Sequence, residues 1–289
     1  MQTLADIKLL LESAGLSPRK SLGQNFLIDK NLIGRLLDAA KLTPGELVLE
    51  VGPGTGTLTE GLLERGCRVV ACELDRGLAE MLRTRVPTLP MPGAATNFTL
   101  IEGDCLGKHR SLNADAAAAL GAGAKPFKLV ANLPYAAATP LMLTLLINHP
   151  QCSLQAVTIQ KEVAERMAAK PGTDAYGALS IVAQAMAEIA TVATLPPECF
   201  WPRPDVTSAM VLVTRRATPL TADPAGLLDL CQRMFAQRRK QIGTTLGRAT
   251  ALPAGITADQ RPETLSVQQF VQLQESLRVS ETPKDAPVS

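Results

Sequence analysis

The sequence predicts an α/β domain followed by a small helical domain. Strand-like and helix-like runs alternate from residue 47 to about residue 213, which favours a mostly parallel sheet covered on both faces. From residue 219 on, no run is strand-like, and helical patterns lie at 224–235, 238–246 and 267–277. A chain of 289 residues with 46% hydrophobic content can bury one α/β core and still carry a small second domain. We therefore expect domains at 1–217 and 218–289.

A glycine-rich turn follows the first strand-like run, residues 46–51. It reads Gly52-Pro53-Gly54-Thr55-Gly56-Thr57 and leads into a helical pattern at 58–65. Glycines let a ligand approach the backbone, and the amides at the start of the next helix are free to donate. The spacing differs from the Gly-x-Gly-x-x-Gly of dinucleotide sites, and Glu50 stands just before it. This arrangement suits the methionine end of S-adenosylmethionine better than a pyrophosphate.

Carboxylates stand at the ends of the next two strand-like runs. Residues 68–73 end in Glu73, roughly twenty positions beyond the glycines, where nucleotide-binding units keep an acid for the ribose hydroxyls. Residues 98–102 lead into Gly103-Asp104, whose carboxylate is placed to accept from an adenine amine. Either acid alone is more often a helix cap or a surface charge. Their occurrence at successive strand ends predicts a cofactor site.

A fourth strand-like run, 127–131, is followed by Asn132-Leu133-Pro134-Tyr135. An amide oxygen, backbone carbonyls and an aromatic ring at such a strand end form a pocket for a planar base that carries an exocyclic amine. The amine can donate to Asn132 and to the Leu133 carbonyl while Tyr135 stacks on the ring. Asn-x-Pro is also ordinary turn sequence, so the segment gains its meaning from the cofactor motifs upstream.

Basic residues cluster although the net charge is only +2. Between residues 231 and 250 there is no acid, and the basic residues are Arg233, Arg238, Arg239, Lys240 and Arg248. Such a cluster can bind phosphates, and it can equally be the solvated face of a helix.

The cysteines and the apolar stretches point to the cytoplasm. The six cysteines show no close pairing, which predicts reduced packing residues. The uncharged stretch 129–160 is interrupted by prolines, so we expect strand, loop and short helix there and no membrane span. We expect no metal site, because His109 and His149 have no ligand-like neighbours.

These motifs together resemble the ribosomal RNA small-subunit adenine dimethyltransferase family. The resemblance runs from about Lys20 to Leu277, with motifs in the same order at 21–27, 50–56, 73–75, 103–104, 132–135, 160–163, 176–180 and 237–240. It implies a Rossmann-like S-adenosylmethionine-dependent methyltransferase fold with a seven-stranded, mostly parallel sheet. It also implies methyl transfer to N6 of two adjacent adenines in a terminal hairpin of small-subunit ribosomal RNA during ribosome assembly, by a monomer.

The resemblance assigns roles to individual residues. The cofactor contacts it implies are Asn25, Leu27, Gly52, Gly54, Glu73, Asp104 and Asn132. The residues around the target base are Asn132, Leu133, Pro134, Tyr135 and Phe200, with Phe200 holding the base opposite Tyr135. The alternative for Phe200 and the adjacent Trp201 is a hydrophobic plug. The RNA contacts are Arg238, Arg239 and Lys240, in a basic helix of the helical domain.

Two departures from the family pattern concern the same region. Ala136-Ala137-Ala138 replaces the usual Asn-Ile-Ser/Thr and removes hydrogen-bonding capacity beside the target pocket. Asp205 stands where a basic residue is usual, which puts a local RNA contact in doubt. The Ala-, Gly- and Pro-rich segments 89–97 and 109–125 are expected to be loops.

Three other functions remain open from the sequence. A DNA or large-subunit ribosomal RNA adenine-N6 methyltransferase would use the same motifs. A non-catalytic nucleic-acid-binding homologue is disfavoured by the intact glycine, Glu73, Asp104 and Asn132 motifs. A small-molecule methyltransferase is disfavoured by the basic cluster and the additional domain.

Overall fold

The computed structural model describes residues 1–107, 111–121, 123–247 and 250–281, which form two compact units. The first unit consists of Met1–Ala164 and Ala190–Arg215, and the second of Glu165–Ile189 and Arg216–Ser289. The second segment of this unit begins within two residues of the predicted boundary at 217/218, but the unit also takes in residues 165–189. The separate domains 1–217 and 218–289 stay a prediction.

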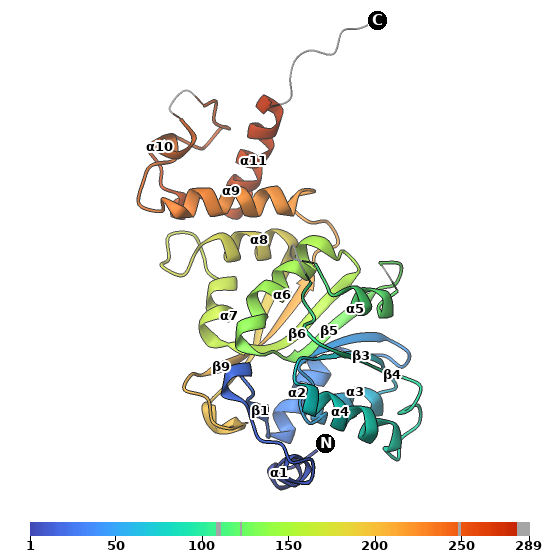
Figure 1. Cartoon of the computed structure of the whole chain (residues 1–289). Coiled ribbons are helices and arrows are strands. Elements are labelled where there is room, and N and C mark those ends of the chain that lie inside the picture. Colours follow the sequence, from blue (N-terminus) through green and yellow to red (C-terminus); the bar gives the residue numbers. More distant parts are fainter. Residues whose placement is uncertain (108–110, 122, 248–249, 282–289) are drawn as a thin grey trace, which may run out of the picture. The chain divides into compact units, whose positions relative to one another are not determined.

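A seven-stranded sheet organises the first unit, in the order β4-β3-β2-β5-β6-β9-β7 (Figure 1). The strands are β2 (Leu47–Val51), β3 (Arg68–Glu73), β4 (Phe98–Glu102), β5 (Phe127–Asn132), β6 (Cys152–Gln160), β7 (Ala187–Leu195) and β9 (Ser208–Arg215). Neighbouring strands are parallel to one another from β4 through β3, β2 and β5 to β6, and β9 is antiparallel to β6. The predicted α/β class with a mostly parallel seven-stranded sheet is confirmed.

Helices cover this sheet, and short elements connect them. They are α1 (Leu4–Ser13), η1 (Lys20–Leu22), α2 (Lys30–Ala39), α3 (Thr57–Glu64), α4 (Arg76–Arg85), η2 (Val86–Thr88), α5 (Ala114–Ala119), α6 (Tyr135–Asn148), α7 (Lys161–Met167) and η4 (Pro197–Cys199). Leucines of α2, α3 and α4 share one buried cluster with Val48, Val69 and Val130 of the sheet. Figure 1 shows α5 and α6 on the other side of the strands. Burial on both faces explains why the strand sequences are continuous apolar runs.

Parallel pairing brings the ends of β2, β3, β4 and β5 to one edge of the sheet. Val51 is in register with Cys72, Glu73 with Glu102, and Asn132 with Thr158. A second, two-stranded sheet pairs β1 (Phe26–Leu27) with β8 (Phe200–Trp201). This pairing ties the segment before α2 to the proline-rich turn after β7. The motifs of residues 25–27 and 200 are therefore held beside each other.

The second unit is helical around an aromatic cluster. Its elements include α8 (Ala178–Met186), α9 (Pro224–Ala236), α10 (Ile242–Leu246), η5 (Pro262–Thr264) and α11 (Val267–Glu281). The ring of Phe235 lies 6.2 Å from that of Tyr176 and 5.9 Å from that of Phe270. The Tyr176 hydroxyl donates to the Leu265 carbonyl at 2.9 Å.

Two expectations about local structure were wrong. The helix predicted at 238–246 covers only Ile242–Leu246, so Arg238, Arg239 and Lys240 lie in a turn after α9. The segment 109–125, expected to be a loop, contains α5, because Asn113 caps an alanine run of high helix propensity. His109 lies outside the described residues.

In the described part of the chain, the cysteines are not joined by disulfides and no helix could cross a membrane. All six cysteines are free thiols, and five of them are buried. Within the ranges that the structure describes, every helix is too short or too polar to cross a bilayer.

Candidate active site

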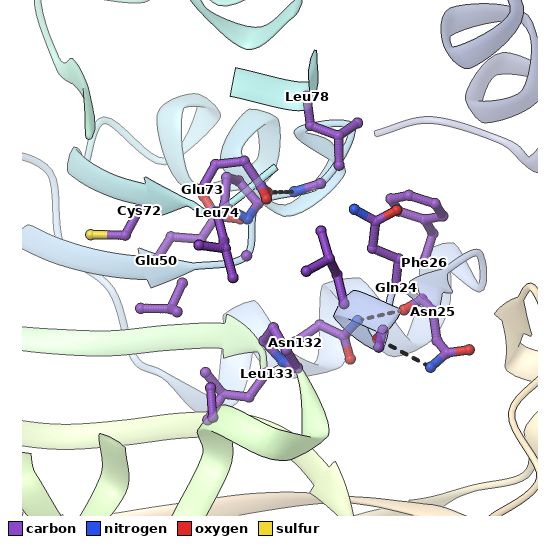
Figure 2. Close-up of a pocket in the computed structure, with 18 of the residues that line it drawn as sticks. Gln24, Asn25, Phe26, Glu50, Cys72, Glu73, Leu74, Leu78, Asn132 and Leu133 are labelled. Atoms are coloured by element: carbon purple, nitrogen blue, oxygen red, sulfur yellow. Dashed lines mark hydrogen bonds between the residues drawn. The ribbon is translucent and has the colours of Figure 1, made fainter. Parts of the chain in front are cut away.

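A cavity of about 520 Å³ lies at the carboxyl edge of the parallel strands (Figure 2). It is entirely within the first unit, and its walls come from residues 20–27, the glycine turn and the ends of β3, β4 and β5. Every residue predicted to contact the cofactor or the target base lines it: Asn25, Leu27, Gly52, Gly54, Glu73, Asp104, Asn132, Leu133, Pro134, Tyr135 and Phe200. Its size is typical of a small-molecule or cofactor site. The structure thus brings the predicted residues together, and what each one binds stays a prediction.

The glycine turn forms one wall of the cavity, and no residue larger than glycine fits at Gly52 or Gly54. Gly52 and Gly54 have φ values of 69° and 62°, in the left-handed region that side chains disfavour. A Cβ on Gly52 would lie 3.0 Å from Cγ of Pro134, and a Cβ on Gly54 would lie 2.8 Å from Cε1 of Phe26. The turn is therefore packed against the two segments that close the cavity. This cradle leaves the backbone itself exposed to a ligand.

Glu73 is held by the backbone on both sides of its carboxylate. Its Oε2 accepts from the Gly54 amide at 3.0 Å, and its Oε1 accepts from the Asp75 amide at 2.9 Å. The side chain is only 5% exposed, and this burial raises its pKa although both amides act in the opposite direction. Each oxygen keeps a further lone pair for a hydroxyl donor. The carboxylate is therefore fixed in position before any ligand arrives.

Glu50 lies behind the glycine turn and also lines the cavity. It is 1% exposed, and the Thr59 hydroxyl of α3 donates to its Oε2 at 2.7 Å. Burial raises its pKa to about 8 against the effect of Thr59, and the nearby Glu73 carboxylate raises it further. In the absence of a ligand cation, Glu50 is therefore largely protonated at neutral pH.

Asp104 follows β4 at the opening of the cavity. Its Oδ1 accepts from the Leu106 amide at 2.9 Å in a tight turn, and the side chain is exposed. The neighbouring Gly103 has a φ of 131°, which turns the chain away from the sheet. The carboxylate therefore stands at the edge of the same cavity as Glu73, one strand further along.

Asn132 is the last residue of β5, and its amide has a defined orientation. Its Nδ2 donates to the backbone carbonyl of Asn25 at 2.9 Å, as Figure 2 shows. Since the nitrogen is engaged, the oxygen Oδ1 remains as the acceptor. The following Leu133 amide donates to the Thr158 carbonyl at 3.1 Å, which ties this segment to β6.

Tyr135 begins α6 and is anchored by its hydroxyl. The phenol oxygen lies 2.9 Å from Oγ of Ser208 in β9, a serine that is fully buried. The half-buried position of the ring raises the pKa of Tyr135, so the phenol stays protonated at neutral pH. Phe200 also lines the cavity, but it is 3% exposed and belongs to the apolar core. Its predicted place opposite Tyr135 against a target base stays a prediction.

Two residues of the site were given no role from sequence, although both belong to the family motifs. Gln24 and Asp75 bind each other across 51 positions of sequence, with Nε2 of Gln24 3.0 Å from Oδ2 of Asp75. No local pattern reveals a contact of this separation. The only sequence signal is their proximity to predicted cofactor ligands. Gln24 directly precedes Asn25, and Asp75 lies two positions after Glu73.

The basic residues Arg238, Arg239 and Lys240 of the second unit lie in the turn after α9. One of them is bound to backbone carbonyls, and the other two are exposed. The Arg238 guanidinium donates to the carbonyls of Asp174 and Thr173 at 2.7 and 3.0 Å. α9 ends at Ala236, where the Gln237 amide bonds back to the carbonyls of Met234 and Phe235, and in the turn that follows Arg238 holds the loop that precedes α8. Arg239 and Lys240 are exposed, and Arg248 lies outside the described residues. Their RNA contacts stay a prediction.

The Rossmann-like sheet, the glycine turn with successive acids, and the Asn-Leu-Pro-Tyr segment define an S-adenosylmethionine-dependent methyltransferase. The family model described as ribosomal RNA adenine dimethylase matches residues 15–278. The chain belongs to this family, as the sequence predicted.

Similar proteins with curated names are close in sequence and in length. The chain is 42% identical over 275 residues to "Ribosomal RNA small subunit methyltransferase A" of Magnetococcus marinus, covering 92% of this chain and 94% of that protein. It is 37% identical over 282 residues to the protein of the same name from Streptomyces griseus, covering 94% and 93%.

Solved structures agree in fold. A dimethyladenosine transferase from Plasmodium falciparum superimposes with a TM-score of 0.70 at 21% identity, over 88% of this chain and 98% of that one. The 23S rRNA methyltransferase ErmE superimposes with a TM-score of 0.63 at 25% identity, over 88% and 100%.

Proposed function

We propose that this protein transfers methyl groups from S-adenosylmethionine to N6 of two adjacent adenosines in a terminal hairpin of small-subunit (16S) ribosomal RNA. The product is N6,N6-dimethyladenosine, formed during ribosome assembly. The observation that carries the proposal is the common cavity that the cofactor motifs share with Asn132-Leu133-Pro134-Tyr135. The substrate follows from the small-subunit methyltransferases that the chain resembles along more than nine tenths of its length.

The residues of the cavity fit S-adenosylmethionine. The glycine turn presents its backbone to the cavity, packed against Pro134 and Phe26 without room for a Cβ, and Glu73 offers fixed acceptors for ribose hydroxyls. Asp104, one strand further, is the acceptor for the adenine amine, and Asn25, Leu27 and Asn132 complete the contacts. When bound, the cofactor supplies a methyl group already activated by the sulfonium charge.

The chain's own residues have to orient the target amine. With its nitrogen bound to the Asn25 carbonyl, Asn132 presents Oδ1 to one N6 hydrogen, and the Leu133 carbonyl accepts the other. Tyr135 stacks on the base, which must leave its helix to reach the cavity, and Phe200 faces it from the core side. The amine lone pair is thereby directed out of the plane of the base. No protein residue has to act as a nucleophile, because the amine itself attacks a methyl group that is already activated, and the protein supplies the orientation.

Exposed basic side chains of the second unit bind the RNA. Arg239 and Lys240 contact phosphates, while Arg238 supports the turn that presents them. The protein acts in the cytoplasm as a monomer.

A large-subunit ribosomal RNA substrate is the second candidate. It is favoured by the similarity to the 23S rRNA methyltransferase ErmE over 88% of this chain. The identity of 25% there is well below the 42% shared with the small-subunit methyltransferase of Magnetococcus marinus. The small-subunit substrate therefore takes precedence.

One experiment separates these possibilities. Purified protein and labelled S-adenosylmethionine are incubated in parallel with unmethylated small subunits, large subunits, duplex DNA and nucleosides, and the digested products are resolved by mass spectrometry. We expect N6,N6-dimethyladenosine from small subunits alone, at two adjacent positions. Label in large subunits or DNA would replace the proposed substrate, and cofactor binding without transfer to any of them would indicate the non-catalytic homologue.

A further inference from the structure

The segment that closes the cofactor cavity pairs through β1 with β8, and polar side chains fasten it at two further points. Residues 20–27 line the cavity one after another, yet this stretch contains only the short η1 and the two-residue strand β1. A segment with so little regular structure needs side-chain contacts to keep a single conformation. The structure shows one such contact to the end of β3 and one to the end of β5.

The first fastening point is Asp75, which follows the cofactor strand β3. Gln24 donates through Nε2 to Asp75 Oδ2 at 3.0 Å, while Oε1 of Gln24 accepts from the Arg19 amide at 2.7 Å. Arg19 Nε lies 3.4 Å from the same Asp75 oxygen. Asp75 is 3% exposed, and its other oxygen, Oδ1, accepts from the Gly77 amide and caps α4. Both ends of the Gln24 amide are thus used, and the carboxylate that Gln24 binds is buried.

The second fastening point lies one residue further along the chain. The carbonyl of Asn25 accepts from Nδ2 of Asn132 at 2.9 Å, and the Asn25 side chain donates to the Gly23 carbonyl at 3.2 Å. This carbonyl decides which end of the Asn132 amide faces it, because a carbonyl can only accept. A shift of the Gln24–Asn25 backbone would release Asn132 to rotate and turn a nitrogen toward the target amine.

We propose that Gln24 and Asp75 form a clasp that positions Asn132 through the Asn25 carbonyl and holds residues 20–27 over the cofactor. This proposal rests on the proposed function, because it assigns Gln24 a positioning role in that methyl transfer. The clasp joins the two halves of the site: Asp75 donates its amide to Glu73, and Asn25 orients Asn132. Loss of the clasp is therefore expected to affect both cofactor affinity and the rate with all ligands bound.

Exchanging the hydrogen-bond donor and acceptor between residues 24 and 75 tests the clasp. In Gln24→Glu the donor is lost and two carboxylates face each other, so the segment is pushed away from β3. In Asp75→Asn the cap of α4 is kept, since Asn is as good a cap as Asp, but two amide nitrogens face each other. Combining Gln24→Glu with Asp75→Asn restores one donor and one acceptor in exchanged places and leaves a carboxylate beside Arg19.

The measurements are the cofactor dissociation constant by calorimetry and the single-turnover rate of methyl transfer to small subunits at saturating cofactor and RNA. We expect each single variant to bind the cofactor several-fold more weakly and to react about tenfold more slowly even at saturation, because a misplaced orienting group costs rate. The double variant should recover most of both losses. Gln24→Met, which removes the donor without adding charge, should also be slow, and it decides the matter if the double variant does not fold.

Gln151→Glu is the matched control. Gln151 donates to the Gly123 carbonyl at 2.7 Å at the opposite end of the sheet, just before β6, so it loses a similar bond and gains the same charge. We expect it to lower the melting temperature without slowing saturated transfer. Saturated rates equal to wild type in Gln24→Glu and Gln24→Met, or equal slowing by Gln151→Glu, would overturn the clasp. Failure of the wild-type protein to methylate small subunits would instead overturn the proposed function.

Discussion

The cavity of the first unit and the basic turn of the second hold their polar side chains in opposite ways. Asn132 and Glu73 are bound to backbone groups at 2.9 to 3.0 Å, with Glu73 buried and Asn132 partly buried. Arg239 and Lys240 are exposed in a turn, where salt screens each charge and the side chains keep their freedom. The cavity therefore depends on the geometry of single groups, whereas the turn depends on the number of charges. Substitutions should be costly in the first and gradual in the second.

The largest effect is expected at Asn132. Asn132→Ala removes the acceptor for the target amine and should reduce single-turnover methyl transfer by about a hundredfold or more, while folding and RNA binding stay nearly intact. Tritium transfer from labelled cofactor into unmethylated small subunits measures it. Asn132→Asp is the companion variant, since a carboxylate would be repelled by the Asn25 carbonyl and should also be slow. Transfer near the wild-type rate in Asn132→Ala would remove Asn132 from its assigned role.

Glu73 tests the cofactor half of the cavity. Glu73→Ala should weaken S-adenosylmethionine binding by about 1.5 to 3 kcal/mol, because charge-assisted bonds to the ribose are lost. It also leaves the Gly54 and Asp75 amides without an acceptor, so a melting curve must show that the variant is folded. Isothermal titration gives the affinity. An unchanged dissociation constant would exclude Glu73 as a cofactor ligand.

Glu50 tests the cost of burying a carboxyl behind the glycine turn. Its folded-state pKa of about 8 lies above its ordinary value of 4.5, so its contribution favours folding at low pH and is lost as the pH rises from about 4.5 to 8. Glu50→Gln stays neutral and still accepts from Thr59. Without cofactor, the variant should gain roughly 2 to 4 kcal/mol relative to wild type between pH 5 and pH 8. Urea unfolding at both pH values checks this, with exposed Glu12→Gln as the control that should show no such gain.

The sequence was most informative where topology leaves little choice. Apolar runs that end in Gly52, Glu73, Gly103 and Asn132 predict parallel strands, and parallel strands must bring those ends to one edge. The contacts that orient the residues were not predictable, because the bond from Asn132 to Asn25 spans 107 positions and ends on a backbone carbonyl. Every residue type has a backbone carbonyl, so no residue pattern in the sequence indicates this hydrogen bond.

For the basic turn at residues 238–240, by contrast, the structure predicted from the sequence was wrong. A run of arginine and lysine favours a helix by propensity, but α9 ends at Ala236, and Arg238 in the following turn binds the carbonyls of Thr173 and Asp174, some 64 residues away. Local propensity therefore did not predict the conformation of this segment, which also makes a tertiary contact. The same contact separates the three cations into one supporting residue and two exposed ones, a distinction that the sequence does not contain.

That distinction sharpens the RNA-binding prediction. Arg239→Ala combined with Lys240→Ala should weaken RNA binding and reduce the slope of log K against log salt by about one unit for each phosphate that the variant no longer neutralises, with cofactor affinity unchanged. Arg238→Ala should instead lower the melting temperature, since it releases the loop before α8. Filter binding at several salt concentrations gives the slope. If the double variant keeps the wild-type slope, the turn is only a solvated surface.

The smallest effect is expected from the hydroxyl of Tyr135. Stacking on the base needs the ring, so Tyr135→Ala should weaken capture of the flipped adenine strongly, whereas Tyr135→Phe loses only the bond to Ser208 at 2.9 Å. A neutral hydrogen bond of this kind contributes about 0.5 to 1.5 kcal/mol, which corresponds to a rise of about two- to twelvefold in KM for RNA with cofactor affinity unchanged. Ser208→Ala should reproduce the effect of Tyr135→Phe, and the double variant should add little, because both remove the same bond. Effects of the two single variants that add in full would show that the bond does not position the ring, and the aromatic wall would then depend on packing alone.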